Sequence, residues 1–252
     1  MGQEMLVTYL ITTWNRKEIL RQHLALLMEQ SWPYWFEVIV CVDGSTDGTQ
    51  EMVASMRNTS KYTLQFHDTG SVEENTAAKA RNLGLKHAKG DMIVMADDDC
   101  WPHPQLIEKY AERFNPTQVQ LGYKSCTEAN LRESLPVPIE EGNPTIWMRD
   151  HLAGVFCHFQ TGTCAMSREA ANIPTKQGGK GFDERFVGYG HEDTEFGRRL
   201  LALGYRLIFN PDAVIWHVNA GIAPQQDPVK KQEGIKRSNE MLQMILGEAW
   251  PK

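Results

Sequence analysis

The chain has 252 residues, of which 41% are hydrophobic and 23% are charged. A chain of this length buries enough apolar surface to fold without disulfides or a structural metal, and its lack of long polar or repetitive tracts excludes wholesale disorder. The formal net charge of −6 argues against a general nucleic-acid binder, because neutralising phosphates needs a basic surface.

The first half of the chain alternates between two hydrophobic patterns. Short apolar runs predict strands at residues 6–12, 36–42, 63–66 and 92–96. Apolar residues at helical spacing predict helices at residues 16–30, 46–56, 75–87 and 104–114. Apolar strands that are each followed by a helix are typical of a parallel sheet covered on both faces. Ligands bind such sheets beyond the carboxyl ends of the strands, so the polar residues that follow the strands are candidate site residues.

The second half of the chain begins less regularly. Residues 124–150 contain three prolines, and we interpret them as a connecting or substrate-facing segment. The elements predicted after it are a strand pair at 156–166, a glycine-rich loop at 178–181, a helix at 192–203, two short strands at 205–209 and 213–217, and a C-terminal helix at 227–247.

Three consecutive carboxylates, Asp97, Asp98 and Asp99, follow the predicted strand at 92–96. Adjacent carboxylates repel one another and are costly to hold together without a cation. Oxygen donors of this kind suit Mg²⁺ or Mn²⁺. The cluster therefore indicates a divalent metal site, with a solvated acidic loop as the structural alternative.

A second polar cluster begins at Asp43, after the predicted strand at 36–42. Gly44 permits a tight turn, and the residues that follow it can cap a helix. On its own this pattern is turn chemistry. It is not a phosphate-binding loop, because G-x-x-x-x-G-K-[ST] and G-x-G-x-x-G are both missing.

A third cluster surrounds two glycines, Gly188 and Gly190, which lead into a predicted helix that begins with Glu192 and Asp193. Negative charge is favoured at a helix N-terminus, so capping explains these carboxylates, and a general base is the alternative. His217 closes a short apolar strand, where it is either a packed histidine or the nitrogen ligand of a metal site.

The ordered succession of motifs resembles the family 2 glycosyltransferases with the GT-A fold. The motifs of the first half are TTWNR (12–16), VDGSTDGT (42–49), AKARNLGL (78–85) and ADDDCWP (96–102). The segment at 181–200, GFDERFVGYGHEDTEFGRRL, resembles the C-terminal segment of β-1,4-galactosyltransferases and chondroitin-polymerase-type domains. The resemblance covers residues 5–218. It implies an α/β GT-A fold: a Rossmann-like, mostly parallel central sheet flanked by helices, with a smaller sheet on the acceptor side.

The resemblance also implies roles on the donor side. The residues expected to bind the nucleotide and donor sugar are Thr12, Asn15, Arg16, Asp43, Lys79, Arg81, Asp97 and Asp98. Among them, Asp43 is expected to contact the base, and Arg81 the nucleotide or diphosphate. The metal ion, Mn²⁺ or Mg²⁺, is expected to be held by Asp99, Asp97 and His217, with the two aspartates matching the D-x-D motif of the family.

On the acceptor side, Asp193 matches the general base of the family, and Glu192 beside it is expected to contact a sugar. Tyr189 and Gly190 are expected to bind the acceptor. Tyr189 stands where the galactosyltransferases commonly carry a stacking tryptophan, and this difference leaves the acceptor open.

These residues imply an inverting, metal-dependent transferase that moves a sugar from a nucleotide-sugar, with a UDP-sugar favoured, to an acceptor hydroxyl in polysaccharide or glycoconjugate synthesis. The acceptor is a carbohydrate, a lipid-linked group or another hydroxyl compound. A retaining GT-A transferase is an alternative, although those of the polypeptide type carry D-x-H instead of D-x-D. A nucleotidyltransferase and a non-catalytic sugar-binding protein are the remaining alternatives.

A single GT-A domain is expected over residues 1–252. Within it, residues 1–123 form the nucleotide-sugar-binding half, 124–220 the acceptor and catalytic half, and 221–252 a C-terminal helix. No signal peptide, apolar run of bilayer length or C-x-x-C pair is present, so a cytoplasmic protein with reduced thiols is expected. The C-terminal helix carries a basic group, Lys230, Lys231, Lys236 and Arg237, which is either a solvated face or a peripheral contact with the inner membrane surface.

Overall fold

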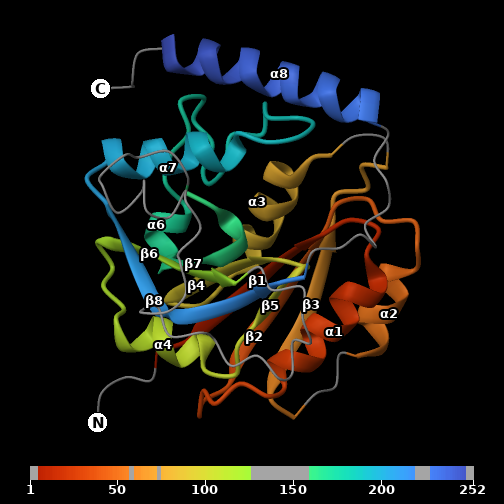
Figure 1. Cartoon of the computed structure of the whole chain (residues 1–252), viewed down its shortest axis with the longest axis vertical. Coiled ribbons are helices and arrows are strands. Elements are labelled where there is room, and N and C mark those ends of the chain that lie inside the picture. Colours follow the sequence, from red (N-terminus) through yellow and green to blue (C-terminus); the bar gives the residue numbers. More distant parts are fainter. Residues whose placement is uncertain (1–4, 57–59, 73–74, 126–158, 219–227, 248–252) are drawn as a thin grey trace.

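The computed structural model describes residues 5–56, 60–72, 75–125, 159–218 and 228–247 (Figure 1). The strands are β1 (Val7–Thr13), β2 (Phe36–Val42), β3 (Tyr62–Asp68), β4 (Met92–Asp97), β5 (Cys100–Pro102), β6 (Gln118–Ser125), β7 (Cys164–Ser167) and β8 (Arg206–His217). The α-helices are α1 (Lys17–Leu27), α2 (Thr49–Ser55), α3 (Ala77–His87), α4 (Leu106–Glu112), α6 (Arg168–Ala171), α7 (Glu192–Ala202) and α8 (Pro228–Gly247), and a 3₁₀ helix, η1, spans Thr161–Thr163.

The eight strands of the described residues form one sheet, in the order β3-β2-β1-β4-β7-β6-β8-β5. The pairs β3–β2, β2–β1 and β1–β4 are parallel, so the predicted parallel sheet of the first half is confirmed. The strands of the second half, expected as a smaller sheet, continue from β4. There β7 lies antiparallel to both β4 and β6, β8 lies parallel to β6, and β5 lies antiparallel to β8.

Helices cover both faces of the sheet, and the alternation of side chains along β1 shows how. Tyr9 and Ile11 belong to one buried cluster, which includes residues of α1, α2 and α4. Leu10 belongs to a second cluster, which includes residues of α3, α6 and α7. Because successive side chains of a strand point to opposite faces, a continuous apolar run such as β1 can fill both cores.

Two predictions about the second half are wrong. The strand pair predicted at 156–166 is replaced by η1 and the single strand β7, and residues 156–158 lie outside the described residues. The two short strands predicted at 205–209 and 213–217 are one strand, β8, with a bulge. Its pairing shifts from Gly122 with Asn210 to Tyr123 with Val214, so the three residues at 211–213 leave the ladder without ending the strand.

Strands β5 and β6 were not predicted, and α2 begins three residues later than expected. Gly48 precedes α2 with φ of 84°, a left-handed conformation that a right-handed helix does not continue through. Asp47 Oδ1 accepts hydrogen bonds from Thr49 N (3.1 Å) and Thr49 Oγ1 (2.6 Å), which fixes the start of the helix. The rest of the irregular segment predicted at 124–150, from residue 126 onward, lies outside the described residues.

The C-terminal helix α8 is confirmed and lies across the top of the molecule in Figure 1, above α7. Its residues Leu242 and Ile245 are buried with Phe186 in a small separate cluster. No helix among the described residues is long and apolar enough to span a bilayer. Contact between the basic residues of α8 and a membrane stays a prediction, and the side chain of Lys230 lies outside the description.

Candidate active site

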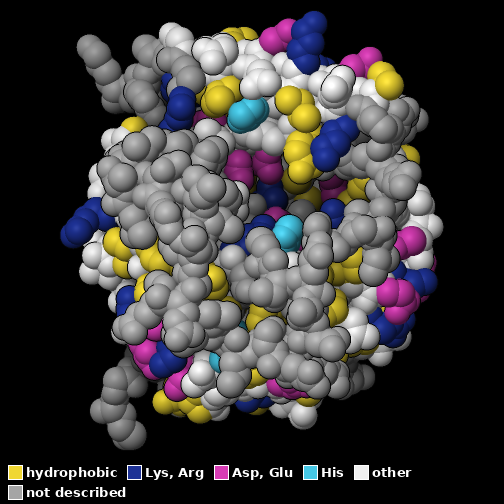
Figure 2. Space-filling model, in the orientation of Figure 1, with side chains coloured by type: hydrophobic (Ala, Val, Ile, Leu, Met, Phe, Trp, Pro, Cys, Tyr) yellow, Lys and Arg dark blue, Asp and Glu magenta, His cyan; other side chains and the backbone are white. Residues whose placement is uncertain are grey.

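A cleft of about 410 Å³ opens beyond the carboxyl ends of β1, β2 and β4, where the sheet rule places a ligand. Figure 2 shows it as a hollow near the middle of the face, where acidic, basic and histidine side chains gather. Of the predicted site residues, the cleft is lined by Thr12, Arg16, Asp43, Arg81, Asp97, Asp98, Asp99, Tyr189, Gly190, Glu192, Asp193 and His217. Residues more than 200 positions apart in the chain are therefore brought to one site.

Asp98 is the buried member of the acidic cluster, and protein groups bind both of its carboxylate oxygens. Oδ2 accepts a hydrogen bond from Thr13 Oγ1 (2.7 Å), and Oδ1 accepts one from Arg16 NH1 (2.9 Å). Its main-chain oxygen lies 3.0 Å from His23 Nδ1. Burial raises the pKa of Asp98 to about 7, although the charge of Arg16 acts to lower it. These contacts hold the turn between β4 and β5 in place.

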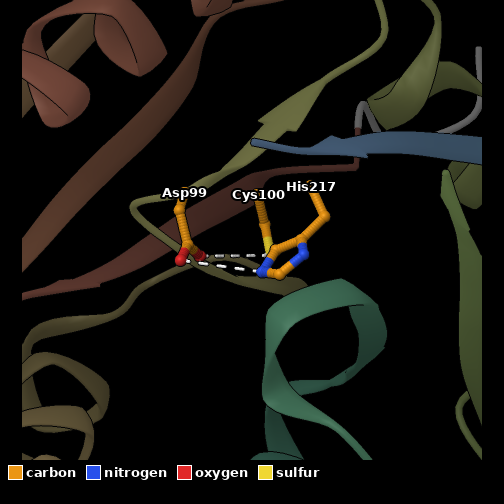
Figure 3. Close-up of side chains that lie close together, drawn as sticks. All are labelled: Asp99, Cys100 and His217. Carbon is orange, nitrogen blue, oxygen red and sulfur yellow. Dashed lines mark hydrogen bonds and ion pairs between the residues drawn. The ribbon is translucent and has the colours of Figure 1, made fainter. Parts of the chain in front are cut away.

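Asp99 and His217 face each other in the cleft, with Asp99 Oδ2 3.6 Å from His217 Nε2 (Figure 3). The same Oδ2 accepts a hydrogen bond from Arg16 NH1 at 2.7 Å. Burial alone raises the pKa of Asp99, but the interaction with His217 and the charge of Arg16 outweigh it and lower the pKa to about 2. Asp99 is therefore a carboxylate throughout the neutral range.

Cys100 completes a group of three candidate metal-ligating side chains, whose ligand atoms all lie within 4.8 Å of one another. Burial raises the pKa of the Cys100 thiol well above its ordinary value, so the thiolate is disfavoured. The ligands that remain are the Asp99 carboxylate and the His217 imidazole. Asp97, expected as a ligand, is not part of this group among the described residues.

Arg81 links the acidic cluster to the start of α7. Its NH2 donates to Asp97 Oδ1 (3.2 Å) and its NH1 to Glu192 Oε1 (2.8 Å), while its guanidinium lies over the ring of Phe182. Arg81 is 5% exposed, so this is a buried charge held between two carboxylates. The sequence predicted that Arg81 contacts the nucleotide or diphosphate, whereas in the structure its guanidinium binds the carboxylates of Asp97 and Glu192.

Asp193 lies in the first turn of α7, beside Glu192. Burial, followed by the charge of Glu192, raises the pKa of Asp193 to about 7, and Arg81 acts in the opposite direction. One of its oxygens, Oδ1, accepts a hydrogen bond from Thr194 N at 2.7 Å. A carboxyl group with a pKa near neutrality is suited to accept a proton from a substrate.

Asp43 is buried at the end of β2 and ties three segments together. Its Oδ2 accepts a hydrogen bond from Thr76 N (2.6 Å), and its Oδ1 accepts from Thr69 Oγ1 (2.9 Å) and from Thr76 Oγ1. Burial raises the pKa of Asp43, while the hydrogen bonds from Thr76 act to lower it. The carboxylate thereby fixes the loop after β3 and the start of α3 around the cleft.

Two predicted donor-binding residues do not line the cleft. Asn15 adopts φ of 51°, which asparagine tolerates better than most residues, and its Oδ1 accepts a hydrogen bond from Thr46 N (2.7 Å). It therefore shapes the loop after β2. Lys79 is exposed on α3.

The cleft also contains residues that the sequence did not single out. They are Thr13, Trp14, Asn75, Ala77, Lys124, Gln160, Thr161 and Gly162. Trp14 lies inside the TTWNR motif, so that motif was a usable signal for it. Lys124 is the last residue but one of the unpredicted strand β6, and Gly162 lies in η1. An added Cβ on Gly162 would be 3.0 Å from Asp97 Oδ2, so glycine relieves crowding where this turn approaches the acidic cluster.

Comparison with known sequences gives a consistent set of relatives. The sequence profile of Glycosyl transferase family 2 matches residues 8–173. The chain is 31% identical over 269 positions to the chondroitin synthase of Pasteurella multocida (strain Pm70), covering 92% of this chain and 26% of that protein. It is 30% identical over 237 positions to the hyaluronan synthase of Pasteurella multocida, covering 80% of this chain and 23% of that protein. The chain thus spans about a quarter of the length of these two relatives.

Solved structures share the fold at lower sequence identity. One is a mannosyltransferase from Pyrobaculum calidifontis in complex with GDP-Man and Mn²⁺, with 22% identity and a TM-score of 0.63 over 97% of this chain and 65% of that chain. Another is Staphylococcus aureus TarS, residues 1–349, in complex with UDP, with 19% identity and a TM-score of 0.61 over 93% of this chain and 64% of that chain. Both have the GT-A fold, which confirms the expected fold class.

Proposed function

The chain belongs to glycosyl transferase family 2, a family of transferase enzymes, and on that premise we propose that it moves a sugar from a UDP-sugar to a hydroxyl group of a glycan, with inversion at the anomeric carbon. The observation that supports the proposal most strongly is which side chains line the same cleft. Asp193, a carboxyl group with a pKa of about 7, lines the same cleft as the Asp99–His217 pair. A base and a metal-binding pair are the two features that such a transfer requires.

In the proposed step, the Asp193 carboxylate accepts the proton of the acceptor hydroxyl. The acceptor oxygen forms a bond to the anomeric carbon of the donor, the bond from that carbon to the phosphate oxygen breaks, and UDP leaves with the electron pair. Attack on the face opposite the leaving group inverts the configuration. The pKa of about 7 suits the task, since a general base works best when its pKa is close to the working pH.

The residues present fit a divalent metal ion. The candidate ligands are one carboxylate, Asp99, and one imidazole, His217, and this mixed donor set favours Mn²⁺ over Mg²⁺, which prefers oxygen ligands alone. When bound, such an ion acts as a Lewis acid on the diphosphate leaving group. The hydrogen bonds of Asp98 to Thr13 and Arg16 hold the turn that carries Asp99. Asp97, placed against Arg81, acts as a positioning carboxylate in this proposal.

Support for the donor and acceptor comes from the relatives. TarS residues 1–349 were solved with UDP and, separately, with UDP-GlcNAc, whereas the P. calidifontis enzyme was solved with GDP-Man, so a GDP-sugar is the alternative donor. The two Pasteurella relatives are named for glycan polymers, chondroitin and hyaluronan. We therefore place this chain in polysaccharide synthesis, with a growing glycan as the acceptor.

The test is release of UDP from a panel of UDP-sugars with Mn²⁺, in the presence of chondroitin or hyaluronan oligosaccharides. Asp193→Asn keeps the shape of the side chain but removes the base, so it should lower transfer by at least about a hundredfold. Asp212→Asn is the matched control, because it replaces an exposed aspartate of β8 that does not line the cleft.

The configuration of the new linkage is read by NMR of the product. An α-linked donor should give a β-linked product. Retention of configuration, or full activity of Asp193→Asn, would overturn the mechanism.

A further inference from the structure

The loop that contains Tyr189 is in close backbone contact with helix α8. Gly188 adopts φ of 104°, and an added Cβ there would lie 2.9 Å from the Cα of Gly234 in α8. In the other direction, an added Cβ on Gly234 would lie 3.1 Å from Tyr189 N and 3.4 Å from Gly188 Cα. Glycine is less favourable than alanine inside a helix, so a buried glycine at this point of α8 is explained by the close approach.

A second contact joins the same two segments through side chains. The ammonium group of Lys231 in α8 lies 4.5 Å from the centre of the Tyr189 ring. A cation over the face of an aromatic ring is attracted by the electrons of that face. The Tyr189 side chain is 46% exposed and lines the cleft, so Lys231 is its partner at the mouth of the site.

Helix α8 is in turn anchored to neighbouring segments. Leu242 and Ile245 pack against Phe186, two residues before Gly188. Lys176 Nζ donates a hydrogen bond to Ile245 O at 2.6 Å. The loop itself is tied at its other side by a hydrogen bond from Gly188 N to Asn75 O at 2.8 Å. The helix therefore presents Lys231 and Gly234 to the loop from a fixed position.

We propose that α8 positions the acceptor-binding loop, residues 188–190, and that Lys231 and Gly234 are positioning residues for the acceptor. The inference rests on the proposed function, in which Tyr189 binds the acceptor sugar. Asp99 lies in the turn between β4 and β5 and His217 ends β8, and among the described residues no hydrogen bond or ion pair joins either of them to α8. Disturbing α8 should therefore weaken binding of the acceptor and leave cleavage of the donor intact.

Substitutions in α8 and two measurements test the inference. Gly234→Ala adds one methyl group against the loop, and Lys231→Gln removes the cation. The matched controls are Gly247→Ala, because an added Cβ there meets nothing within 4 Å, and Lys236→Gln, which removes an exposed lysine from the same helix. Alanine favours the helix more than glycine does, so Gly234→Ala keeps α8 folded.

The first measurement is hydrogen–deuterium exchange of the peptide that spans 186–196, without any ligand. Exchange should be faster in Gly234→Ala and Lys231→Gln than in wild type, and unchanged in both controls. Equal exchange in all five proteins would overturn the inference while leaving the proposed function untouched.

The second measurement separates acceptor binding from donor cleavage by steady-state UDP release. With chondroitin or hyaluronan oligosaccharide as the probe, KM for the acceptor should rise about threefold in Lys231→Gln, and Lys231→Arg should restore it. Slow release of UDP without acceptor should stay at the wild-type rate.

An equal loss of transfer to the acceptor and of UDP release without acceptor would mean that α8 is merely structural, and would overturn the inference. If wild type releases no UDP from any donor, the proposed function fails, and the exchange result still decides whether α8 holds the loop.

Discussion

Replacing Asp193 by asparagine should make the protein more stable, and the gain should grow with pH. The structure raises the pKa of Asp193 from the ordinary 3.8 to about 7, chiefly by burial and then by the charge of Glu192. The folded protein thus keeps a proton on Asp193 that the unfolded chain releases near pH 4. As pH rises from about 4 to 7, the folded state binds more protons than the unfolded state, so the stability of the wild type falls.

The size of the effect follows from the same two values. They differ by about 3 pH units, and each unit corresponds to about 1.36 kcal/mol, which gives about 4 kcal/mol over the whole range. Between pH 5 and pH 8 about two of these units are crossed, which gives about 3 kcal/mol. Asparagine has no such titration, and its side-chain oxygen can still accept the hydrogen bond from Thr194 N.

The assay is urea unfolding of wild type and Asp193→Asn at several pH values from 5 to 8. The free energy of unfolding of the variant, minus that of the wild type, should increase with pH and level off above about pH 7. The titration of Asp98 is shared by both proteins and cancels in this difference. In Asp212→Asn, the control, the difference should stay flat. If the difference in free energy of unfolding between Asp193→Asn and wild type also stays constant with pH, the raised pKa of Asp193 is refuted. The main support for its role as a base is then lost.

Three further predictions concern the framework of the site. Arg81→Met should lower the free energy of unfolding, measured in urea, by about 3 kcal/mol, because it leaves Glu192 and Asp97 without their buried partner; a loss below about 1 kcal/mol would contradict the stabilising role of Arg81 between these carboxylates. His217→Ala should weaken Mn²⁺ binding at least about tenfold in an EPR titration with no nucleotide present, and unchanged affinity would exclude His217 as a ligand. Gly84→Ala should lower the free energy of unfolding by about 1–3 kcal/mol, because the new Cβ would lie 2.2 Å from Cys41 Sγ between α3 and the sheet; wild-type stability would show that α3 can move away freely.

The sequence predicted best where local pattern and tertiary structure agree. Strand β2 was predicted with its observed bounds, because a continuous apolar run buried on both faces has no competing interpretation. Strand β6 was missed because its buried polar residue, Gln120, looks like a surface residue in sequence. In the structure Gln120 Nε2 donates to Tyr110 O (2.8 Å), and its Oε1 accepts from Asn210 Nδ2 (2.7 Å). Such partners are not visible in a linear sequence.

The residues of the candidate site were likewise predicted only in part. Asp99, His217 and the acidic residues of α7 were predicted as site residues because their motifs resemble a family, and the structure brings them into one cleft. The sequence did not show that Lys79 is exposed and Arg81 is buried, because both are basic residues in one short motif of α3. Two residues apart on a helix, they face different directions, and only the packing of α3 against the sheet decides which one is buried.

The pairing of β5 with β8 has a consequence for how the protein can change over evolution. Cys100 pairs with His217 in the antiparallel ladder, and Val218 N donates to Asp99 O at 2.9 Å. The distance between Asp99 and His217 is therefore set by main-chain hydrogen bonds that do not depend on the identity of the neighbouring side chains. Substitutions around the pair should be tolerated far better than single-residue insertions or deletions in β8, because each such change moves every later residue by one place in the ladder. In a library of variants, length changes near 217 should be depleted even where nearly every amino acid is accepted at 216.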